Sequence, residues 1–440
     1  MPVSRQAWKG IKVERQNESN IDLRFFAGVD LGSGEHAVHV VDESGKRLDG
    51  FTGEHGGAGQ AALADRLRRI CGGSPELMGV ALETPRAALV ELLLEQGFAV
   101  FAINPKQLDR FRDRHSPSGA KDDARDARVL AGSLRTDRAS FRRLNPESAL
   151  TIELRDLSRL DEGLKRDFRR GCNQLREQLH RYYPQLLGLC PAADEPWFWA
   201  LLKRAPLPAA GAKLTPANIR QVLALNGIRR LSGDDIAAAL RTPPLQVSPG
   251  TAAAASRHAL MLVPRLDLLF RQIGETLAAM ESALESMASD SEHQGHRDAA
   301  ILLSLPGIGP VTGAAMLGEA AEPLRNRDYH ALRSLAGSAP VTRQSGKRLV
   351  VGMRHGCHPR LRNALHGAVS CHVRWDPRAR EQYQRLKAAG HNHARAVRGV
   401  GDRLLRLVVT LLKNGELYDP QRRLLPETKT VAATGQPVIC

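Results

Sequence analysis

Several common features are missing from this sequence of 440 residues. Its six cysteines show no CxxC spacing, which argues against a disulfide framework and against a thiolate zinc site. No apolar run approaches the roughly 18 residues that a membrane-spanning helix needs, and no signal peptide opens the chain. We therefore expect a cytoplasmic protein whose cysteine thiols are reduced.

A phosphate-binding loop of the pattern GxxxxGK[ST] is also missing, so we do not expect the protein to consume ATP. The cluster of His355, Cys357 and His358 is compatible with half of a metal site, but no second pair of ligands follows at a suitable spacing. A loop that merely contains these residues is the interpretation that we prefer.

What the sequence does contain is a large excess of positive charge. It has 63 Lys and Arg against 47 Asp and Glu, a formal net charge of +16, and this balance favours a polyanionic partner. Nucleic acid is the first candidate, and a membrane surface is the competing one. With 42% hydrophobic residues, a chain of this length is expected to form two or three domains.

The first part of the chain predicts an α/β domain. Residues 1–24 are polar and lack periodicity, and we interpret them as a flexible leader. The segments FFAGVDLG, EHAVHVVDE and RLDGFTGEH then predict an antiparallel meander of three short strands. After them, helical and buried-strand patterns alternate in the segments 61–72, 79–85, 86–97 and 98–105. This is the order of elements in the ribonuclease-H-like fold, and we place the domain at 25–145.

Four acidic residues lie where they can act together. Asp30 is near the end of the first predicted strand and Glu83 ends a later one. If these strands are parallel neighbours, their carboxyl ends meet at one edge of the sheet. Asp123 and Asp126 open a predicted helix and are three residues apart, so they share one face, although Asp122 and Asp126 are also helical neighbours.

Such a group of like charges repels itself unless a cation lies between its members. Oxygen ligands suit hard divalent ions such as Mg²⁺, and two such ions can support phosphodiester exchange. The alternative is that the acids of the helix only stabilise its first turn, where negative charge is favourable. The order of the four acids on this pattern of strands favours the metal site.

The middle of the chain predicts two long helices. Residues 150–182 carry apolar side chains at three- and four-residue spacing, which predicts a helix with a coiled-coil seam. Asp161 and Gly171 interrupt the seam, so pairing within the chain and pairing between chains both remain open. Residues 186–256 are rich in Pro and Ala and predict an inserted subdomain of short helices, and 257–288 predict a second long helix. We assign 146–298 to this region.

A mainly α-helical domain is expected at 299–415, followed by a tail at 416–440. Its phrase LPGIGP predicts a helix-hairpin-helix element, in which the backbone amides around Gly307 and Gly309 meet DNA phosphates. Residues 333–410 hold 16 Lys or Arg against 3 Asp or Glu. A solvated basic face would have the same composition, but its coincidence with the hairpin favours contact with nucleic acid.

These motifs together resemble the DEDD-type insertion-sequence transposases of the IS110 family. The likeness spans most of the chain and rests on VDLG, ALET, the K-x-D-x-x-D-A motif at 121–127, YYPQLL, LPGIGPVTGAAMLGE, LAGSAP, RQSGK and RLRNAL. The resemblance implies a RuvC-like first domain with a metal-binding tetrad that includes Asp123 and Asp126 and leaves Asp122 outside. It implies Mg²⁺ as the cofactor, with Mn²⁺ as a substitute. The loop HGCHPRLR is one residue longer than the family's usual form, and Asp122 replaces the common Thr or Ser.

The resemblance also implies a nucleophilic serine in the second domain, which corresponds to Ser345. On the sequence alone Ser345 is a serine in a polar turn, and a serine hydroxyl attacks phosphorus only with help from a base, a metal or neighbouring cations. The cationic residues that we expect to contact nucleic acid are Lys121, Arg125, Arg343, Lys347, Arg348, Arg360 and Arg362.

The partners implied by the resemblance are donor and target DNA and a non-coding bridge RNA that pairs with both. Base pairing would then select the sequence while the protein holds the backbones. We expect a homodimer or homotetramer, because the acids and the serine belong to domains separated by long helices. The resulting hypothesis is a transposase that forms a transient phosphoserine. A RuvC-like junction endonuclease that uses water is one alternative, and a non-catalytic DNA-binding protein is another.

Overall fold

The computed structural model describes residues 22–83, 85, 87–115, 122–289, 294–346 and 348–421. The chain divides into two compact units, Met1–Glu147 and Ser148–Cys440. Within the described ranges, no helix is both long enough and apolar enough to cross a membrane.

The first unit is built on a mixed six-stranded sheet with the order β3-β2-β1-β4-β5-β6. Its strands are β1 (Phe25–Leu31), β2 (Glu35–Asp42), β3 (Arg47–Glu54), β4 (Met78–Leu82), β5 (Ala99–Ala102) and β6 (Arg142–Arg143). The first three strands pair antiparallel, while β4 lies parallel to both β1 and β5, and β6 runs antiparallel to β5. The predicted meander and the alternation that follows it are confirmed.

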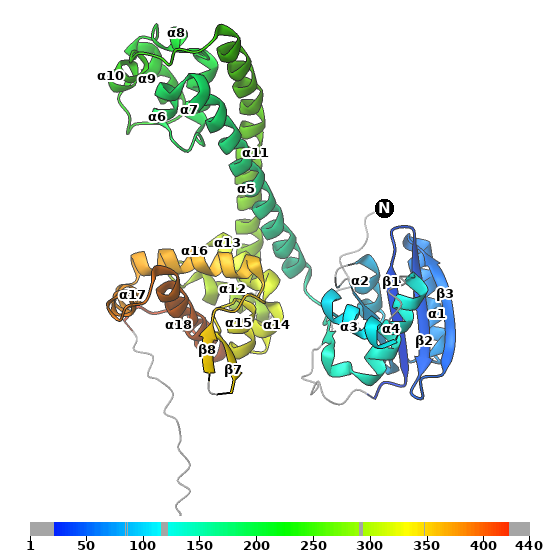
Figure 1. Ribbon diagram of the computed structural model, residues 1–440. Coiled ribbons are helices and arrows are strands. Elements are labelled where there is room, and N and C mark those ends of the chain that lie inside the picture. Colours follow the sequence, from blue (N-terminus) through cyan, green and yellow to red (C-terminus); the bar gives the residue numbers. More distant parts are fainter. Residues whose placement is uncertain are drawn as a thin grey trace, which may run out of the picture. The chain divides into compact units, whose positions relative to one another are not determined.

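Helices cover both faces of this sheet (Figure 1). They are α1 (Gly57–Ile70), α2 (Ala88–Glu95), α3 (Pro105–His115) and α4 (Asp123–Thr136), with short 3-10 turns η1 (Pro75–Leu77) and η2 (Arg138–Ser140). Ala27 and Val29 pack with α1 and α2, whereas Phe26 and Ala81 pack with α4. Neighbouring residues of a strand contact helices on opposite faces of the sheet, because successive side chains point to opposite sides. Strand β4 is buried along its whole length, as expected of a parallel strand that is covered on both faces.

The second unit contains the two predicted long helices, α5 (Ala149–Tyr182) and α11 (Pro249–Ser289). They lie side by side within the chain (Figure 1). Leu154, early in α5, shares a core with Met287, late in α11, whereas Leu179 shares a core with Ala259. The helices are therefore antiparallel, and α5 packs against α11 of the same chain, while pairing between chains stays a prediction. Helix α11 begins at Pro249, earlier than the sequence indicated.

The residue types that interrupt the predicted seam have structural roles in this helix pair. A Cβ atom at Gly171 would lie 2.8 Å from the Leu266 side chain, so glycine allows the two helices to approach closely there. Asp161 is buried, and its carboxylate accepts a 2.8 Å hydrogen bond from Lys165 one turn further along α5. Gly171 is thus explained by the close packing of the two helices, and Asp161 by its ion pair with Lys165.

A helical subdomain lies between the two long helices in the sequence. It consists of α6 (Pro184–Leu189), α7 (Pro196–Arg204), α8 (Pro208–Gly211), α9 (Pro216–Leu225) and α10 (Gly233–Leu240). Trp197, Phe198 and Trp199 of α7 are fully buried in a core that also includes residues of α5 and α11. The predicted short helices are present, and the aromatic residues of α7 anchor them to the helix pair.

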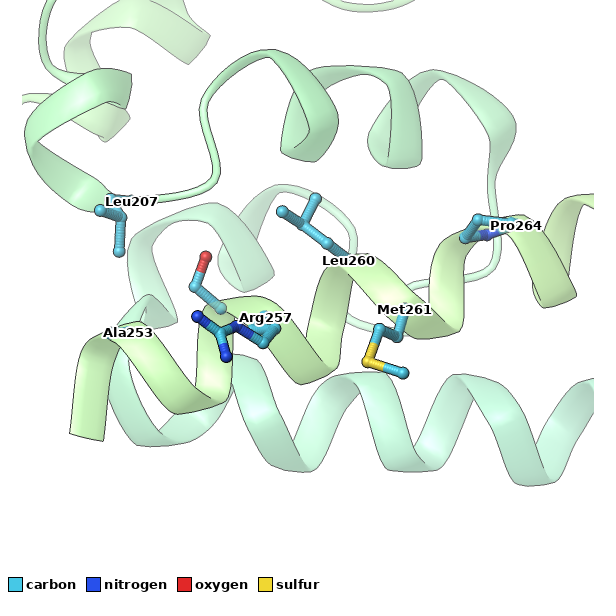
Figure 2. Close-up of a pocket in the computed structure, with 7 residues that line it drawn as sticks. Leu207, Ala253, Arg257, Leu260, Met261 and Pro264 are labelled. Carbon is cyan, nitrogen blue, oxygen red and sulfur yellow. The ribbon is translucent and has the colours of Figure 1, made fainter. Parts of the chain in front are cut away.

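A mostly apolar pocket of about 550 Å³ borders this subdomain (Figure 2). Its lining consists of Leu207, Ala253, Ser256, Arg257, Leu260, Met261 and Pro264. Pro264 lies inside α11 and has no N–H, so the Leu260 carbonyl lacks the usual helical donor at that point. None of the sequence-predicted site residues lines this pocket.

The remaining elements of the second unit form a helical body with a two-stranded hairpin. They are α12 (Gln294–Leu303), α13 (Pro310–Glu319), α14 (Ala321–Arg325), α15 (Tyr329–Leu335), β7 (Val341–Ser345), β8 (Arg348–Gly352), α16 (Pro359–Trp375), α17 (Pro377–Ala388) and α18 (His393–Asn414). The apolar stripe of α18, with Val400, Leu404 and Val408, is buried in the core of this body. Helix α18 ends at Gly415, which adopts a left-handed conformation.

Candidate functional site

Asp30 and Glu83 follow equivalent positions of two neighbouring parallel strands. Val29 of β1 is in register with Leu82 of β4, and the two acids are the next residues of the chain. Gly28 and Ala81, two residues before each acid, face α4. Because the side chains of a strand alternate, Asp30 and Glu83 come from the α4 side of the same sheet edge. Both acids are partly exposed to solvent.

The first turn of α4 supplies the other two acids. Asp122 is the N-cap, and its side chain accepts a 3.2 Å hydrogen bond from the backbone N–H of Ala124, which is the usual role of Asp at this position. Asp123 is exposed, whereas Asp126 is only 1% exposed. The neighbouring Asp122 therefore has a structural role of its own in starting the helix.

Arg112 of α3 lies among these acids, although no sequence motif pointed to it. Its Nε donates to Asp126 Oδ1 at 2.6 Å, its Nη2 donates to Asp126 Oδ2 at 2.7 Å, and Nη2 is also 3.9 Å from Glu83 Oε2. Burial opposes the charged form of Arg112, but its hydrogen bonds and charge interaction with Asp126 raise the pKa of the guanidinium above its usual value. The arrangement joins Glu83, which directly follows β4, to the buried Asp126 of α4.

Arg112 was missed because helix α3 was not predicted. The segment PKQLDRFRDRH is highly charged and has few apolar residues, so its periodicity is weak. The feature of the sequence that could have indicated this helix is the three-residue spacing of Asp109 and Arg112, which form an ion pair on α3. That spacing indicates a helix, but it does not reveal that Arg112 also reaches Asp126.

The chemistry of the four acids fits a hard divalent cation, because all their donor atoms are carboxylate oxygens. The carboxylates of Glu83 and Asp126 are farther apart than the ligands of one bound metal ion, because the guanidinium of Arg112 lies between them. In the described part of the chain, the group of three potential ligands within 4.8 Å of one another is Cys190, Asp194 and Glu195. Two groups of side chains are therefore candidates for a metal site.

The group around Cys190 is explained by structural contacts. Glu195 accepts hydrogen bonds from Arg230 at 2.6 Å and from the Trp197 indole at 2.8 Å. Burial raises the pKa of the Cys190 thiol, which opposes the thiolate form that would bind a metal. The acids of the first unit are the better candidates for a metal site.

Ser345 ends strand β7 in an exposed hairpin of the second unit. It pairs in register with Arg348 of β8, and Gly346 in the connecting turn has a φ of +55°, a conformation that favours glycine. Arg343 is exposed and lies two residues before Ser345, so both side chains project from the same face of the hairpin. The structure thus places Ser345 beside at least one exposed cation. Lys347 lies outside the described residues.

The other cationic residues have different surroundings. Lys121 lies outside the described residues, and Arg125 is partly buried. Arg360 contacts Glu162, and its Nη1 lies 3.6 Å from Glu319 Oε1. Arg362 Nη1 is 3.6 Å from the Cys357 sulfur. Arg360 is therefore committed to an ion-pair network, and Arg343 is the more accessible guanidinium.

The network around Glu319 joins three helices of the second unit. The Glu319 side chain of α13 is 1% exposed and accepts two hydrogen bonds, of 2.7 and 2.9 Å, from Arg159 of α5. His358, the N-cap of α16, places its Nε2 3.5 Å from Glu319. Burial would raise the pKa of Glu319, but Arg159 and the neighbouring cations lower it below its usual value. The carboxylate is therefore a charged centre of the packing between α5, α13 and α16.

The turn between α12 and α13 uses its two glycines in different ways. Gly307 has a φ of +97°, and a Cβ atom there would lie 2.4 Å from the backbone oxygen of Ala368 in α16. Gly309 is exposed at the N-cap of α13. The close packing of Gly307 explains glycine at that position without DNA, so contact with phosphate stays a prediction, and Gly309 is the more accessible of the two.

Comparison with known proteins identifies the class of this chain. A DEDD-type family model described as a transposase matches residues 27–184, and a model described as the transposase IS116/IS110/IS902 family matches residues 299–384. A mini-circle protein of Streptomyces coelicolor, named as a candidate transposase for IS117, is 33% identical over 418 residues, which are 93% of this chain and 99% of that protein. The insertion element IS110 43.6 kDa protein of Streptomyces coelicolor is 26% identical over 90% of this chain and 96% of its own length.

The matched segments carry both the acids of the sheet edge and Ser345. The class that they define is that of insertion-sequence transposases, enzymes that move DNA segments. The chain belongs to the IS110 family of these transposases, and a DEDD-type member of this family is expected to use a divalent metal.

Proposed function

We propose that this transposase cuts and rejoins donor and target DNA by Mg²⁺-dependent phosphoryl transfer through a transient phosphoserine at Ser345. The observation that carries the proposal is the convergence of acids at one sheet edge. Asp30 lies near the end of β1, Glu83 directly follows the neighbouring parallel strand β4, and Asp126 of α4 is linked to Glu83 through Arg112. The order of the first five strands, with three antiparallel strands followed by two parallel ones, supports a ribonuclease-H-like, RuvC-like first domain.

The four acids of the first unit would hold the metal. Asp30, Glu83, Asp123 and Asp126 supply the carboxylate oxygens, and the bound metal would stabilise charge on the phosphate oxygens during the transfer. The exposure of Asp123 and the partial exposure of Asp30 and Glu83 leave room for a phosphate group to approach. Asp122 is assigned to capping α4 and takes no part in the chemistry.

Ser345 would supply the attacking oxygen. A bond forms between Ser345 Oγ and the phosphorus while the bond between phosphorus and one DNA ester oxygen breaks. The serine hydroxyl loses its proton, and the departing DNA oxygen gains one. A hydroxyl end of another strand then attacks the phosphoserine and releases the serine. The number of phosphate ester bonds is conserved, so no ATP is needed.

The proposed partners are donor and target DNA and a bridge RNA that selects them by base pairing. Exposed Arg343, on the same face of the hairpin as Ser345, is suited to hold the scissile phosphate. We further propose a homodimer or homotetramer in which the acids and the serine meet, and a location in the cytoplasm. The domain boundaries predicted from the sequence, together with the helix-hairpin-helix and coiled-coil assignments, remain part of this proposal.

A covalent-trapping experiment tests the nucleophile. Ser345→Ala should still bind nucleic acid but should give no protein joined to labelled DNA in the presence of Mg²⁺. Thr342→Ala is the matched control, because it removes a hydroxyl from an exposed position on the opposite face of the same strand. A covalent adduct that persists in Ser345→Ala would refute the assignment. Cleavage by the unmodified protein that leaves free ends without attached protein would instead favour a junction endonuclease that uses water, and absence of any metal-dependent recombination would favour a non-catalytic DNA-binding protein.

A further inference from the structure

Arg112 occupies the position of a counter-ion inside the proposed metal site. Its guanidinium binds both carboxylate oxygens of Asp126, at 2.6 and 2.7 Å, and it approaches Glu83 to 3.9 Å. Asp126 is only 1% exposed, and a buried carboxylate is costly unless a cation neutralises it. Arg112 provides that positive charge.

We propose that Arg112 is an exchangeable counter-ion that competes with the divalent metal for Asp126. This inference rests on the proposed metal site. The two Asp126 oxygens that Arg112 holds are the atoms that a metal would need, so the metal can use them only after the guanidinium moves. Because both ligands bind the same carboxylate, each lowers the affinity of the other.

The surroundings of Arg112 permit such an exchange. The Arg112 side chain is 23% exposed, so water reaches part of it, and it has a second acidic partner in Asp109 on the same helix. The guanidinium can therefore release Asp126 while it remains paired with Asp109. Asp126 has no comparable freedom, since it is buried on α4 against the sheet. Arg112 is thus the mobile member of the pair, and it acts as a positioning residue with no role in bond breaking.

The experiment measures Mn²⁺ binding to the full-length protein without DNA, by the electron paramagnetic resonance signal of free Mn²⁺. Arg112→Gln removes the competing charge but retains a polar side chain. A positive charge within about 4–6 Å lowers the proton affinity of a carboxylate by roughly ten- to a thousandfold, and we expect it to lower the affinity for a metal cation in the same direction. Since Arg112 is partly exposed, we expect the lower end of this range, with Mn²⁺ bound about tenfold more tightly.

A second measurement reports the same exchange through stability. Arg112→Gln should lower the melting temperature in EDTA, because Asp126 loses its cation, and Mn²⁺ should raise the melting temperature of this variant by more than it raises that of the unmodified protein. Arg112→Lys keeps the charge but loses the two-pronged geometry, so its Mn²⁺ affinity should be intermediate. This variant keeps the proposal testable if Arg112→Gln does not fold.

Arg110→Gln is the matched control, because Arg110 is an exposed arginine on the same helix. It should leave Mn²⁺ affinity unchanged. Equal or weaker Mn²⁺ binding by both Arg112 variants, with binding by the unmodified protein abolished in Asp126→Asn, would overturn the counter-ion role and leave the metal site standing. If neither the unmodified protein nor Arg112→Gln binds Mn²⁺ in a manner that needs Asp126, the metal site falls and this inference falls with it.

Discussion

Gly28 of β1 lies directly against the backbone of Ala127 in α4, so closely that a Cβ atom on Gly28 would be 2.0 Å from the Ala127 oxygen. This contact sets the height of α4 above the sheet. Asp126 precedes Ala127, and Asp30 follows Gly28 by two residues on the same face of β1. One glycine therefore determines how near the acid of the helix can come to the acid of the strand.

Gly28→Ala should displace α4 and destabilise the protein. The added methyl group would meet the Ala127 oxygen at 2.0 Å and the Ala131 nitrogen at 2.5 Å, and these backbone atoms cannot move independently of the helix. We expect a loss of about 1–3 kcal/mol or more in the free energy of unfolding, measured by urea denaturation. Gly132→Ala is the control, because it adds a methyl group to α4 in open space and should stabilise the helix by up to about 1 kcal/mol. Equal effects of the two substitutions would show that the contact is unimportant.

Adjacent aspartates at the start of α4 should differ in their importance. Asp123→Asn removes one proposed metal ligand from an exposed position, so it should reduce Mn²⁺ affinity at least about tenfold with little change in melting temperature. Asp122→Asn keeps the helix cap, because Asn caps helices as well as Asp does, and should behave as the unmodified protein does. The measurement is the Mn²⁺ affinity of both variants. A loss of Mn²⁺ affinity in Asp122→Asn but not in Asp123→Asn would exclude the proposed assignment of the metal ligands.

Two arginines of the second unit should report different roles when each is changed to Gln. Arg343 is exposed on the hairpin, so Arg343→Gln should weaken DNA binding and reduce the slope of log affinity against log salt by about 1, without a change in stability. Arg360 is held by Glu162 and Glu319, so Arg360→Gln should lower the free energy of unfolding by about 1 kcal/mol. Salt titrations of DNA binding and thermal unfolding separate the effects, and the reverse pattern would contradict the assignment.

His358 should make the stability of the second unit sensitive to pH. Burial lowers the pKa of His358 below its ordinary value of 6.5, more than Glu319 raises it. Its Nδ1 also accepts a hydrogen bond from the Leu361 N–H, which requires that nitrogen to be unprotonated. The unfolded chain therefore binds a proton more readily than the folded one. The stabilising contribution is complete above pH 6.5 and is lost as the pH falls towards the lowered folded pKa.

His358→Asn tests this effect because it keeps an N-cap but cannot titrate. Between about pH 7.5 and 5.5, the melting temperature of this variant should fall less than that of the unmodified protein. His366→Asn, at an exposed position of the same helix α16, is the control and should not change how the melting temperature depends on pH. An unchanged pH dependence in His358→Asn would refute the assignment.

The sequence by itself determined the local elements of this protein and their order. The period-two pattern from Phe25 onward predicted β1 to β3, and the heptad pattern predicted the long helix that the structure has at Ala149–Tyr182. It also predicted that Asp30 and Glu83 lie at the ends of strands and that Asp126 lies in the first turn of a helix. These features follow from short-range periodicity and from helix-capping preferences, which neighbouring residues specify.

Only the tertiary structure decided which distant groups meet. The sequence could not show that Arg112 reaches Asp126, that Arg360 is paired with Glu162, or that α5 packs against α11 of the same chain. The partner of a charged side chain depends on how helices and sheets pack, because residues far apart in the chain compete for the same carboxylate. Packing therefore fixed the electrostatic surroundings of the site, while the local sequence fixed the elements that carry it.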